Sequence, residues 1–265
     1  YVLCEDFYYG AVLYGADGSF SRYFGANQVE VTLEQLADRF WRLFMTDTQK
    51  GYLSQYVPTD YNSFDIDEDD FIYTCSLSQQ STNELKKLNA LGNNMLRSAI
   101  TYDPLNKEDY GERERVWYNG KYLDSNLVDV DVSEQGMIHA LDFTYGRVYQ
   151  YDQDSNLLAI LGGMGEQMGL FRMPVAVESV GSDILVLDAD KATVTVFSLT
   201  EYGQLINKAT LLYNEGYYDQ AMEEWQQLLQ HNLNSEQANR GIGRAYLEQG
   251  NYKAVSYTHL RAHET

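Results

Sequence analysis

A short motif that occurs twice, far apart in the chain, limits the possible folds more than any other feature. Residues 6–12 read DFYYGAV and residues 142–148 read DFTYGRV, so five of the seven positions are identical. Each copy is preceded by a strand-like run and followed by a second run, a polar turn, a third run and a glycine. Such recurrence of strands and turns indicates a repeat architecture.

Two further copies of this unit are found from their strand and turn patterns. One runs from residue 175 to 199, and a weaker one runs from residue 64 to 92 with residues 71–75 as its middle strand. Asp142 and Asp188 hold the same place in successive copies and are 46 residues apart. A unit of four short strands needs a length of chain close to this spacing.

Two segments show clear periodicity of different kinds. Between residues 128 and 133, valines alternate with Asp129, Asp131 and Ser133, which predicts a strand with its valines inward and its polar side chains toward water. Between residues 32 and 46, apolar positions recur at helical spacing after a threonine that fits a capping box. We therefore expect a helix inserted between two strand units.

The last copy resembles an NHL repeat. Residues 169–177 read GLFRMPVAV, residues 184–188 read ILVLD and residues 194–197 read VTVF, which gives the glycine, proline, alternating valines and aspartate-ended strand of that family in order. The resemblance implies a partial β-propeller over residues 1–200, with blades at about 1–27, 61–96, 126–163 and 170–200. This fold by itself says little about a ligand.

Near residue 200 the strand period ends and a helical period begins. Leu205, Ala209 and Leu212 mark one face of a first helix, and Trp225 lies on a second helix after a break at residues 215–217. Apolar residues at this spacing predict two helices joined by a short turn, which makes them antiparallel neighbours.

Residues 203–254 resemble tetratricopeptide repeats. Gly250 follows Gly216 by 34 residues, which is the period of that family. Lys208 and Leu233 depart from the family pattern, which usually has leucine and proline there. The resemblance implies a truncated array of helix pairs, so the expected fold class is mostly β with an α-helical C-terminus.

The helical repeats suggest a site for a protein partner. If the first helix of each repeat lines a concave groove, Thr210 and Tyr213 of one repeat lie beside Arg240 and Arg244 of the next. Two arginines one helical turn apart in an acidic chain would bind a partner's carboxylate. We predict these four residues as partner-binding; the alternative is a helix face that contacts only solvent.

Charge and composition exclude several classes of function. The chain has 265 residues, a formal net charge of −20 and a pI of about 4.4. This surplus of carboxylates opposes binding of nucleic acid or of an anionic membrane surface. No apolar run reaches the roughly 18 residues that cross a bilayer, so direct membrane insertion is not expected. Cys4 and Cys75 lie in strand-like runs, which favours buried thiols over a disulfide.

Both ends of the sequence are unusual. Tyr1 lies within a strand-like run, so we expect an upstream part, with any export signal, to be missing. Residues 256–265 read SYTHLRAHET and resemble the translated read-through of a sequencing adapter. We therefore expect residues 255–265 to be an artefactual tail, and we do not interpret its His259 and His263 as a metal-binding pair.

No residues are predicted to be catalytic, cofactor-binding or metal-binding. The acidic runs 65–70 and 152–156 begin like calcium loops, but both lack the glycine and glutamate that such loops need, and they are interpreted as solvated turns. Residues 162–165 read GGMG but do not open a helix, so they are interpreted as a turn between blades. His139 lies in a strand and is expected to be packed or to face the channel.

These features together favour a non-catalytic scaffold protein of the bacterial cell envelope. It would bind protein partners through its propeller and helical surfaces, and its extracytoplasmic location is expected by analogy alone. A metal-dependent (calcium) propeller hydrolase, lactonase or lyase is the first alternative, and a propeller that binds a carbohydrate in its channel is the second. Four blades do not close a ring, so we also expect the chain to be marginally stable or to associate through open sheet edges.

Overall fold

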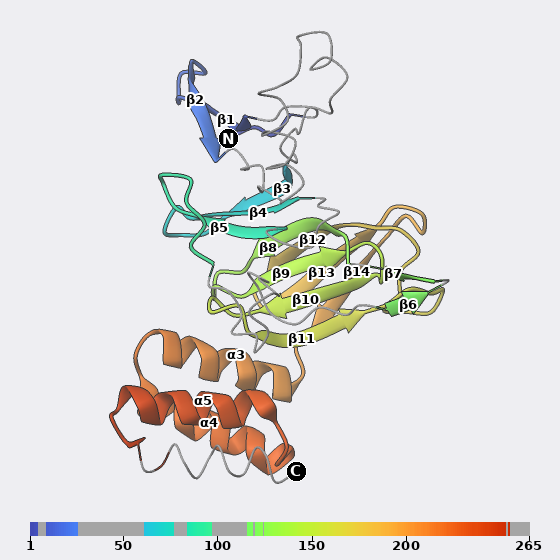
Figure 1. Ribbon diagram of the computed structural model, residues 1–265. Helices are drawn as coiled ribbons and strands as arrows, with labels where there is room; N and C mark the ends of the chain where they lie inside the picture. Colours follow the sequence, from blue (N-terminus) through green and yellow to red (C-terminus); the bar gives the residue numbers. More distant parts are fainter. Residues whose placement is uncertain are drawn as a thin grey trace, which may run out of the picture.

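The computed structural model describes residues 1–4, 9–25, 61–76, 84–96, 116–118, 120–123, 125–252 and 254. The helix predicted for residues 32–46 and the tail predicted for residues 255–265 lie outside these ranges. Within them the chain is mostly β and ends in three α-helices (Figure 1). The predicted fold class is confirmed at this level, while the division into domains stays a prediction.

All the described strands pair antiparallel with a neighbour in the sequence, as expected for chain segments joined by short turns. The sheet orders are β1-β2, β3-β4-β5, β6-β7, β11-β10-β9-β8 and β12-β13-β14. The strands are β1 (Gly10–Tyr14), β2 (Phe20–Gly25), β3 (Tyr61–Ile66), β4 (Ile72–Ser76), β5 (Leu85–Leu88), β6 (Val116–Tyr118), β7 (Lys121–Leu123), β8 (Leu127–Val132), β9 (Ile138–Asp142), β10 (Arg147–Tyr151), β11 (Leu157–Gly162), β12 (Pro174–Val180), β13 (Asp183–Asp188) and β14 (Thr193–Ser198).

The larger sheets pack face to face in chain order. The β8–β11 sheet packs one face on β3–β5, where Ile138 and Tyr149 meet Tyr73. It packs its other face on β12–β14, where Val148 meets Val186. Its neighbour β3–β5 has a second apolar cluster on the far side, shared with β2. Sheets stacked in this way fit a partial propeller.

One prediction about β8 is wrong. Valines and polar residues do alternate along this strand, but Asp131 is only 2% exposed and Ser133 only 8%. The polar side chains do not face water because β12 lies alongside β8, and its Ser179 backbone N–H donates to Asp131. The period of two holds from Asp129 to Ser133, but a register shift between Leu127 and Asp129 places Val128 against the β12–β14 cluster. The pattern also could not tell that a later strand covers the polar face.

The turn predicted at residues 162–165 leads from β11 into β12 and not into a helix. Its start requires glycine, because Gly162 has φ +80° and a side chain there would overlap the ring of Phe171. Gly146, in the neighbouring turn, is also at positive φ, and a Cβ on it would lie 2.9 Å from the Gly163 carbonyl oxygen. These close approaches fix the end of the β8–β11 sheet against the next sheet.

The strand region ends where the helical period begins, as predicted. The helices are α3 (Glu201–Asn214), α4 (Tyr218–His231) and α5 (Glu236–Glu248). Thr200 caps α3 by accepting from the Gly203 N–H, and Ser235 caps α5 by accepting from the Ala238 N–H. Turns of a few residues connect the helices, which are therefore antiparallel neighbours.

The helices share a core with the β8–β11 sheet. Trp225 of α4 is buried against Gly241 of α5, where any side chain would overlap the indole ring. The same apolar cluster includes Met137, which directly precedes β9, and Leu158 of β11. The helices therefore pack directly on the sheet (Figure 1).

Candidate functional site

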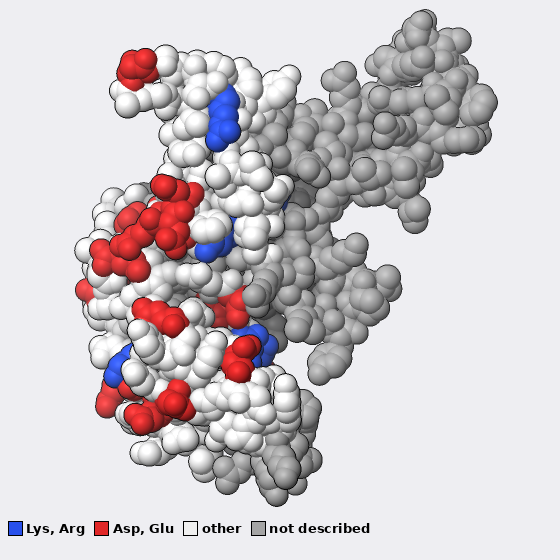
Figure 2. Space-filling model, turned by 90° about the vertical axis from the view of Figure 1, so that its left-hand side faces the viewer, with Lys and Arg blue, Asp and Glu red and all other residues white. Residues whose placement is uncertain are grey.

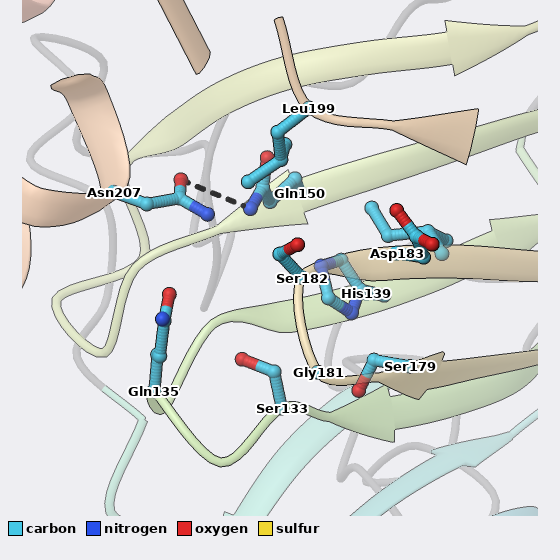
Figure 3. Close-up of a pocket in the computed structure, with 11 residues that line it drawn as sticks. Ser133, Gln135, His139, Gln150, Ser179, Gly181, Ser182, Asp183, Leu199 and Asn207 are labelled. Atoms are coloured by element: carbon cyan, nitrogen blue, oxygen red, sulfur yellow. Dashed lines mark hydrogen bonds between the residues drawn. The ribbon is translucent and has the colours of Figure 1, made fainter. Parts of the chain in front are cut away.

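A row of buried polar side chains crosses the junction between the sheets and the helices. Asp131, His139 and Gln150 are direct neighbours on β8, β9 and β10, and each is 2% exposed. At one end, the Ser179 N–H and hydroxyl donate to Asp131 Oδ1 over 3.0 and 3.1 Å. At the other end, Gln150 Nε2 donates to Asn207 Oδ1 on α3 over 3.2 Å (Figure 3).

His139 stands at the centre of this row. Its Nδ1 lies 2.7 Å from Asp131 Oδ2, and in the tautomer with the proton on Nδ1 it donates to that oxygen. Among the described residues, no group forms a hydrogen bond with the buried Nε2 atom. A histidine oriented by a carboxylate, with its second nitrogen open, has the arrangement of a general base.

The space beside His139 is small and polar. The cavity has a volume of about 10 Å³, which is near the minimum for one water molecule. Ser182 and Asp183 from the β12–β13 turn, Ser133 and Gln135 from the β8–β9 turn, and Asn207 from α3 line it (Figure 3). A site of this size and polarity can hold a water molecule against His139, but it has no room for an organic substrate.

Carboxylates also link the first strands of successive sheets. Asp65 Oδ2 on β3 accepts from the Val132 N–H on β8, and Asp129 Oδ2 on β8 accepts from the Val177 N–H on β12, each over 2.7 Å. Burial raises the pKa of both Asp65 and Asp129 above the usual aspartate value, and the nearby Asp131 charge adds to the effect. The sheets are thus joined by repeated side-chain to backbone contacts.

The two predicted arginines contact a turn of the chain itself. The acidic turn (residues 152–156) connects β10 and β11, and its Asp154 Oδ2 lies 3.5 Å from Arg244 Nη1. Arg244 Nη2 and Arg240 Nη2 donate to Asn156 Oδ1 over 3.2 and 3.4 Å. The interpretation of this turn as solvated is therefore wrong, since α5 packs against it.

The acidic turn is also held from within. Asp152 is 7% exposed, and its Oδ1 accepts from the N–H groups of Asp154 and Asn156. Burial raises the pKa of Asp152. These local bonds preform the loop that the two arginines contact.

The other two predicted partner-binding residues lie within the helical core. Thr210 is 6% exposed. The ring of Tyr213 contacts those of Tyr218 and Trp225, with centroids 5.4 and 5.7 Å apart. Burial raises the pKa of Tyr213 while the Arg244 charge lowers it, so the structure brings Tyr213 near Arg244. Partner binding by the four residues stays a prediction.

The remaining sequence candidates are placed as follows. In the run 65–70, Asp67 Oδ1 accepts from the Asp69 and Phe71 N–H groups and so closes the β3–β4 turn. The prediction of a buried thiol is confirmed for Cys75, whose pKa is raised by burial, and is wrong for Cys4, which is an exposed free thiol. In the described part of the chain, no three His, Cys, Asp or Glu side chains are grouped to hold a metal ion. Nor does that part contain a helix long and apolar enough to span a membrane.

Sequence reasoning missed Asp131, Gln150 and Asn207 as members of one network. Asp131 lies between two valines and Gln150 between two tyrosines, which was the available signal, whereas Asn207 is followed by Lys208 and gave no such signal. The strand pattern alone could not show that Asp131, His139 and Gln150 lie on the same row, because this depends on the strand register.

Comparisons with known proteins give only distant likenesses. No family model and no curated protein matches the chain. It is similar to the structure of a protein of unknown function from Bacteroides caccae, with 14% identity and a TM-score of 0.36 over 53% of this chain and 43% of that one.

The chain is also similar to two structures of virginiamycin B lyase from Staphylococcus aureus. The catalytically inactive lyase with quinupristin gives 10% identity and a TM-score of 0.30 over 57% of this chain and 46% of that one. The selenomethionine-substituted lyase gives 8% identity and a TM-score of 0.25 over 70% and 61%. The chain spans less than two thirds of the length of each of these proteins.

Proposed function

We propose that this chain is a non-catalytic interaction protein of the bacterial cell envelope. In this proposal an NHL-like partial propeller and TPR-like helices form one rigid scaffold that presents binding surfaces in a fixed relative orientation. The observation that carries it is the buried polar row, which runs from Ser179 on β12 through the β8–β11 sheet to Asn207 on α3. Directional hydrogen bonds inside a packed junction restrict its geometry more than apolar contact alone.

The cavity beside His139 supports binding over catalysis. Ligand sites for organic molecules usually enclose several hundred Å³, whereas this cavity has a volume of about 10 Å³. His139 itself is only 2% exposed, so a substrate could not reach its open nitrogen without rearrangement. The Asp131–His139 pair therefore acts in the proposal as part of the junction.

The surface charge indicates what kind of partner the scaffold would bind. Acidic side chains gather on the face at the left of Figure 1, with fewer basic ones among them (Figure 2). The formal net charge of −20 attracts basic partners over distances of about a Debye length. We therefore propose a protein partner with a basic surface.

Partner capture tests this function. The immobilised chain is exposed to bacterial envelope proteins, and we expect a stoichiometric partner whose retention falls as salt rises. Glu68→Gln with Asp69→Asn, which neutralises two exposed carboxylates of the β3–β4 turn, should weaken retention, while Lys208→Ala, which removes an exposed cation paired with Glu224 on the helices, should not. A chain that retains no stoichiometric partner under any of these conditions is not a scaffold of this kind.

Thermal unfolding with calcium and with a chelator separates the scaffold from the metal-dependent alternative. A bound metal would stabilise the folded state by mass action. We expect the same midpoint in both conditions. A rise of several degrees with calcium would favour a metal-dependent hydrolase, lactonase or lyase instead.

Carbohydrate binding is a second candidate, favoured by the aromatic surface of the β1–β2 hairpin. Tyr9, Tyr14, Phe20 and Tyr23 are each between 47% and 64% exposed, and the Tyr9 and Tyr23 rings stack with centroids 5.5 Å apart. Exposed apolar rings of this kind mark binding surfaces. A chain that binds a polysaccharide should migrate more slowly in a gel that contains it, and Tyr14→Ala with Phe20→Ala should abolish the slowing. Unchanged migration of the wild-type chain would exclude that polysaccharide as a ligand.

A further inference from the structure

The β12–β14 sheet has one covered face and one open face. By strand register, one side of the sheet forms the open face: Ala176, Glu178, Val180, Asp183, Leu185, Leu187, Val194, Val196 and Ser198. Val180, Leu187, Val194 and Val196 are between 41% and 62% exposed. Leu187 pairs with Val194 and Leu185 with Val196, so these aliphatic side chains form a continuous ladder.

The side chains of the open face resemble those of the faces that are buried between sheets. On the same three strands, Val177, Ile184 and Val186 form the other face, and all three are buried against the β8–β11 sheet. The β8–β11 and β3–β5 sheets likewise have apolar clusters on both faces, each shared with another strand or sheet. Burying apolar side chains of this kind would gain roughly 25 cal/mol of free energy per Å² of apolar surface, compared with leaving them in water.

Glu178 continues the series of carboxylates that join the sheets. Asp65 on β3 accepts from the N–H of Val132, which follows Asp131, and Asp131 on β8 accepts from the N–H of Ser179, which follows Glu178. Glu178 lies on β12 at the next place in this series and faces outward, with no hydrogen-bond donor among the described residues. The open face thus repeats both features of the internal sheet-to-sheet contacts.

We propose that the open face binds a second copy of the chain through the same face, in a reversible two-fold dimer. The chain carries a formal charge of −20, so two copies repel over most of their surfaces. The open face is the exception, because its two carboxylates, Glu178 and Asp183, lie toward one end and the rest of it, apart from Ser198, is aliphatic. A same-face contact is self-complementary and closes at two copies.

The size of the face sets the expected strength. Three strands about 4.8 Å apart and about 20 Å long cover roughly 300 Å² per copy. Stable interfaces bury about 800 Å² per partner. The dimer should therefore be weak, forming at high protein concentration and more readily at high salt, which screens the repulsion between the two acidic chains.

Light scattering after size exclusion tests the proposal. The mass should rise with concentration from the 30.4 kDa chain toward twice that value, further so in about 1 M salt. Val194→Lys with Val196→Lys should keep the chain monomeric with an unchanged circular dichroism spectrum. Leu233→Lys, a control that adds a charge at a 76% exposed apolar residue between α4 and α5, should leave the dimer intact.

Three outcomes would overturn the proposal. The first is a wild-type chain that stays monomeric up to about 1 mM, a concentration at which even contacts worth about 4 kcal/mol are half formed. The second is a Val194→Lys, Val196→Lys chain that still dimerises. The third is growth beyond two copies, which would show a head-to-tail contact between different surfaces.

Discussion

The two faces of the β8–β11 sheet are built on the same strands but with different chemistry. The face toward β3–β5 carries a large apolar cluster that includes Val130, Ile138 and Tyr149. The face toward β12–β14 and the helices is apolar at one end, around Leu141, and polar at the other, where Asp131, His139 and Gln150 lie in a row. Apolar area favours contact without direction, whereas a buried polar row stabilises only the arrangement that satisfies its hydrogen bonds.

The largest expected effect comes from the polar face. Asp131→Ala removes the acceptor for buried His139 Nδ1 and for both donors of half-buried Ser179. A buried donor left without its acceptor costs about 1–3 kcal/mol, so the loss of all three bonds should cost about 3–5 kcal/mol. Urea denaturation measures the loss. Asp131→Asn keeps an acceptor oxygen and should lose clearly less, so equal losses would show that the hydrogen bonds do not matter.

A slightly smaller loss is expected on the apolar face. Ile138 is fully buried between the two sheets, so Ile138→Ala removes packed methyl groups and leaves a cavity. Such changes cost about 2–5 kcal/mol, and we expect a value near the middle of that range. Ile160→Ala on β11, where the side chain is 47% exposed, is the control and should change stability by less than about 0.5 kcal/mol. Equal losses at Ile138 and Ile160 would contradict the packing described here.

A feature could be predicted from the sequence when the residues that determine it lie close together along the chain. The change from strands to helices near residue 200 depends on local periodicity, and it was predicted correctly. The burial of Asp131 depends on Ser179, which lies 48 residues further along the chain. No local pattern contains that partner.

The candidate site shows the same division. Helical spacing correctly placed Arg240 and Arg244 one turn apart, but their contacts in the acidic turn are more than 80 residues upstream. Thr210 was assigned to a groove and is buried in the helical core, because spacing alone does not tell which of two faces packs inward. His139 was correctly expected to be packed, while its pairing with Asp131 required the register of β8 and β9.

The joining carboxylates should make stability depend on pH. Burial raises the folded-state pKa of Asp65 and Asp129, so the folded chain holds their protons more tightly than the unfolded chain. The free energy of unfolding therefore falls as pH rises from the usual aspartate pKa, about 3.9, through the raised folded-state pKa of these two groups. Asp65→Asn with Asp129→Asn keeps an acceptor for each backbone N–H and removes both charges.

The test is a comparison of unfolding free energies between about pH 7 and pH 5. Wild type should gain stability on acidification relative to the double variant, and the variant should be at least as stable at neutral pH. The effect should be smaller than that of either single core substitution. A variant that loses as much stability as Asp131→Ala would show that these carboxylates need their charge to join the sheets.

The smallest effect is expected at the contact between α5 and the acidic turn. The Arg244 side chain is 34% exposed and its ion pair with Asp154 spans 3.5 Å, so solvent screens the attraction. Pairs of this kind contribute about 0.2–1 kcal/mol. A double-mutant cycle with Arg244→Ala and Asp154→Ala should give a coupling energy in that range, and faster amide exchange in the turn should accompany it. A coupling above about 2 kcal/mol would mean that the arginine, and not the buried row behind it, holds the helices on the sheet.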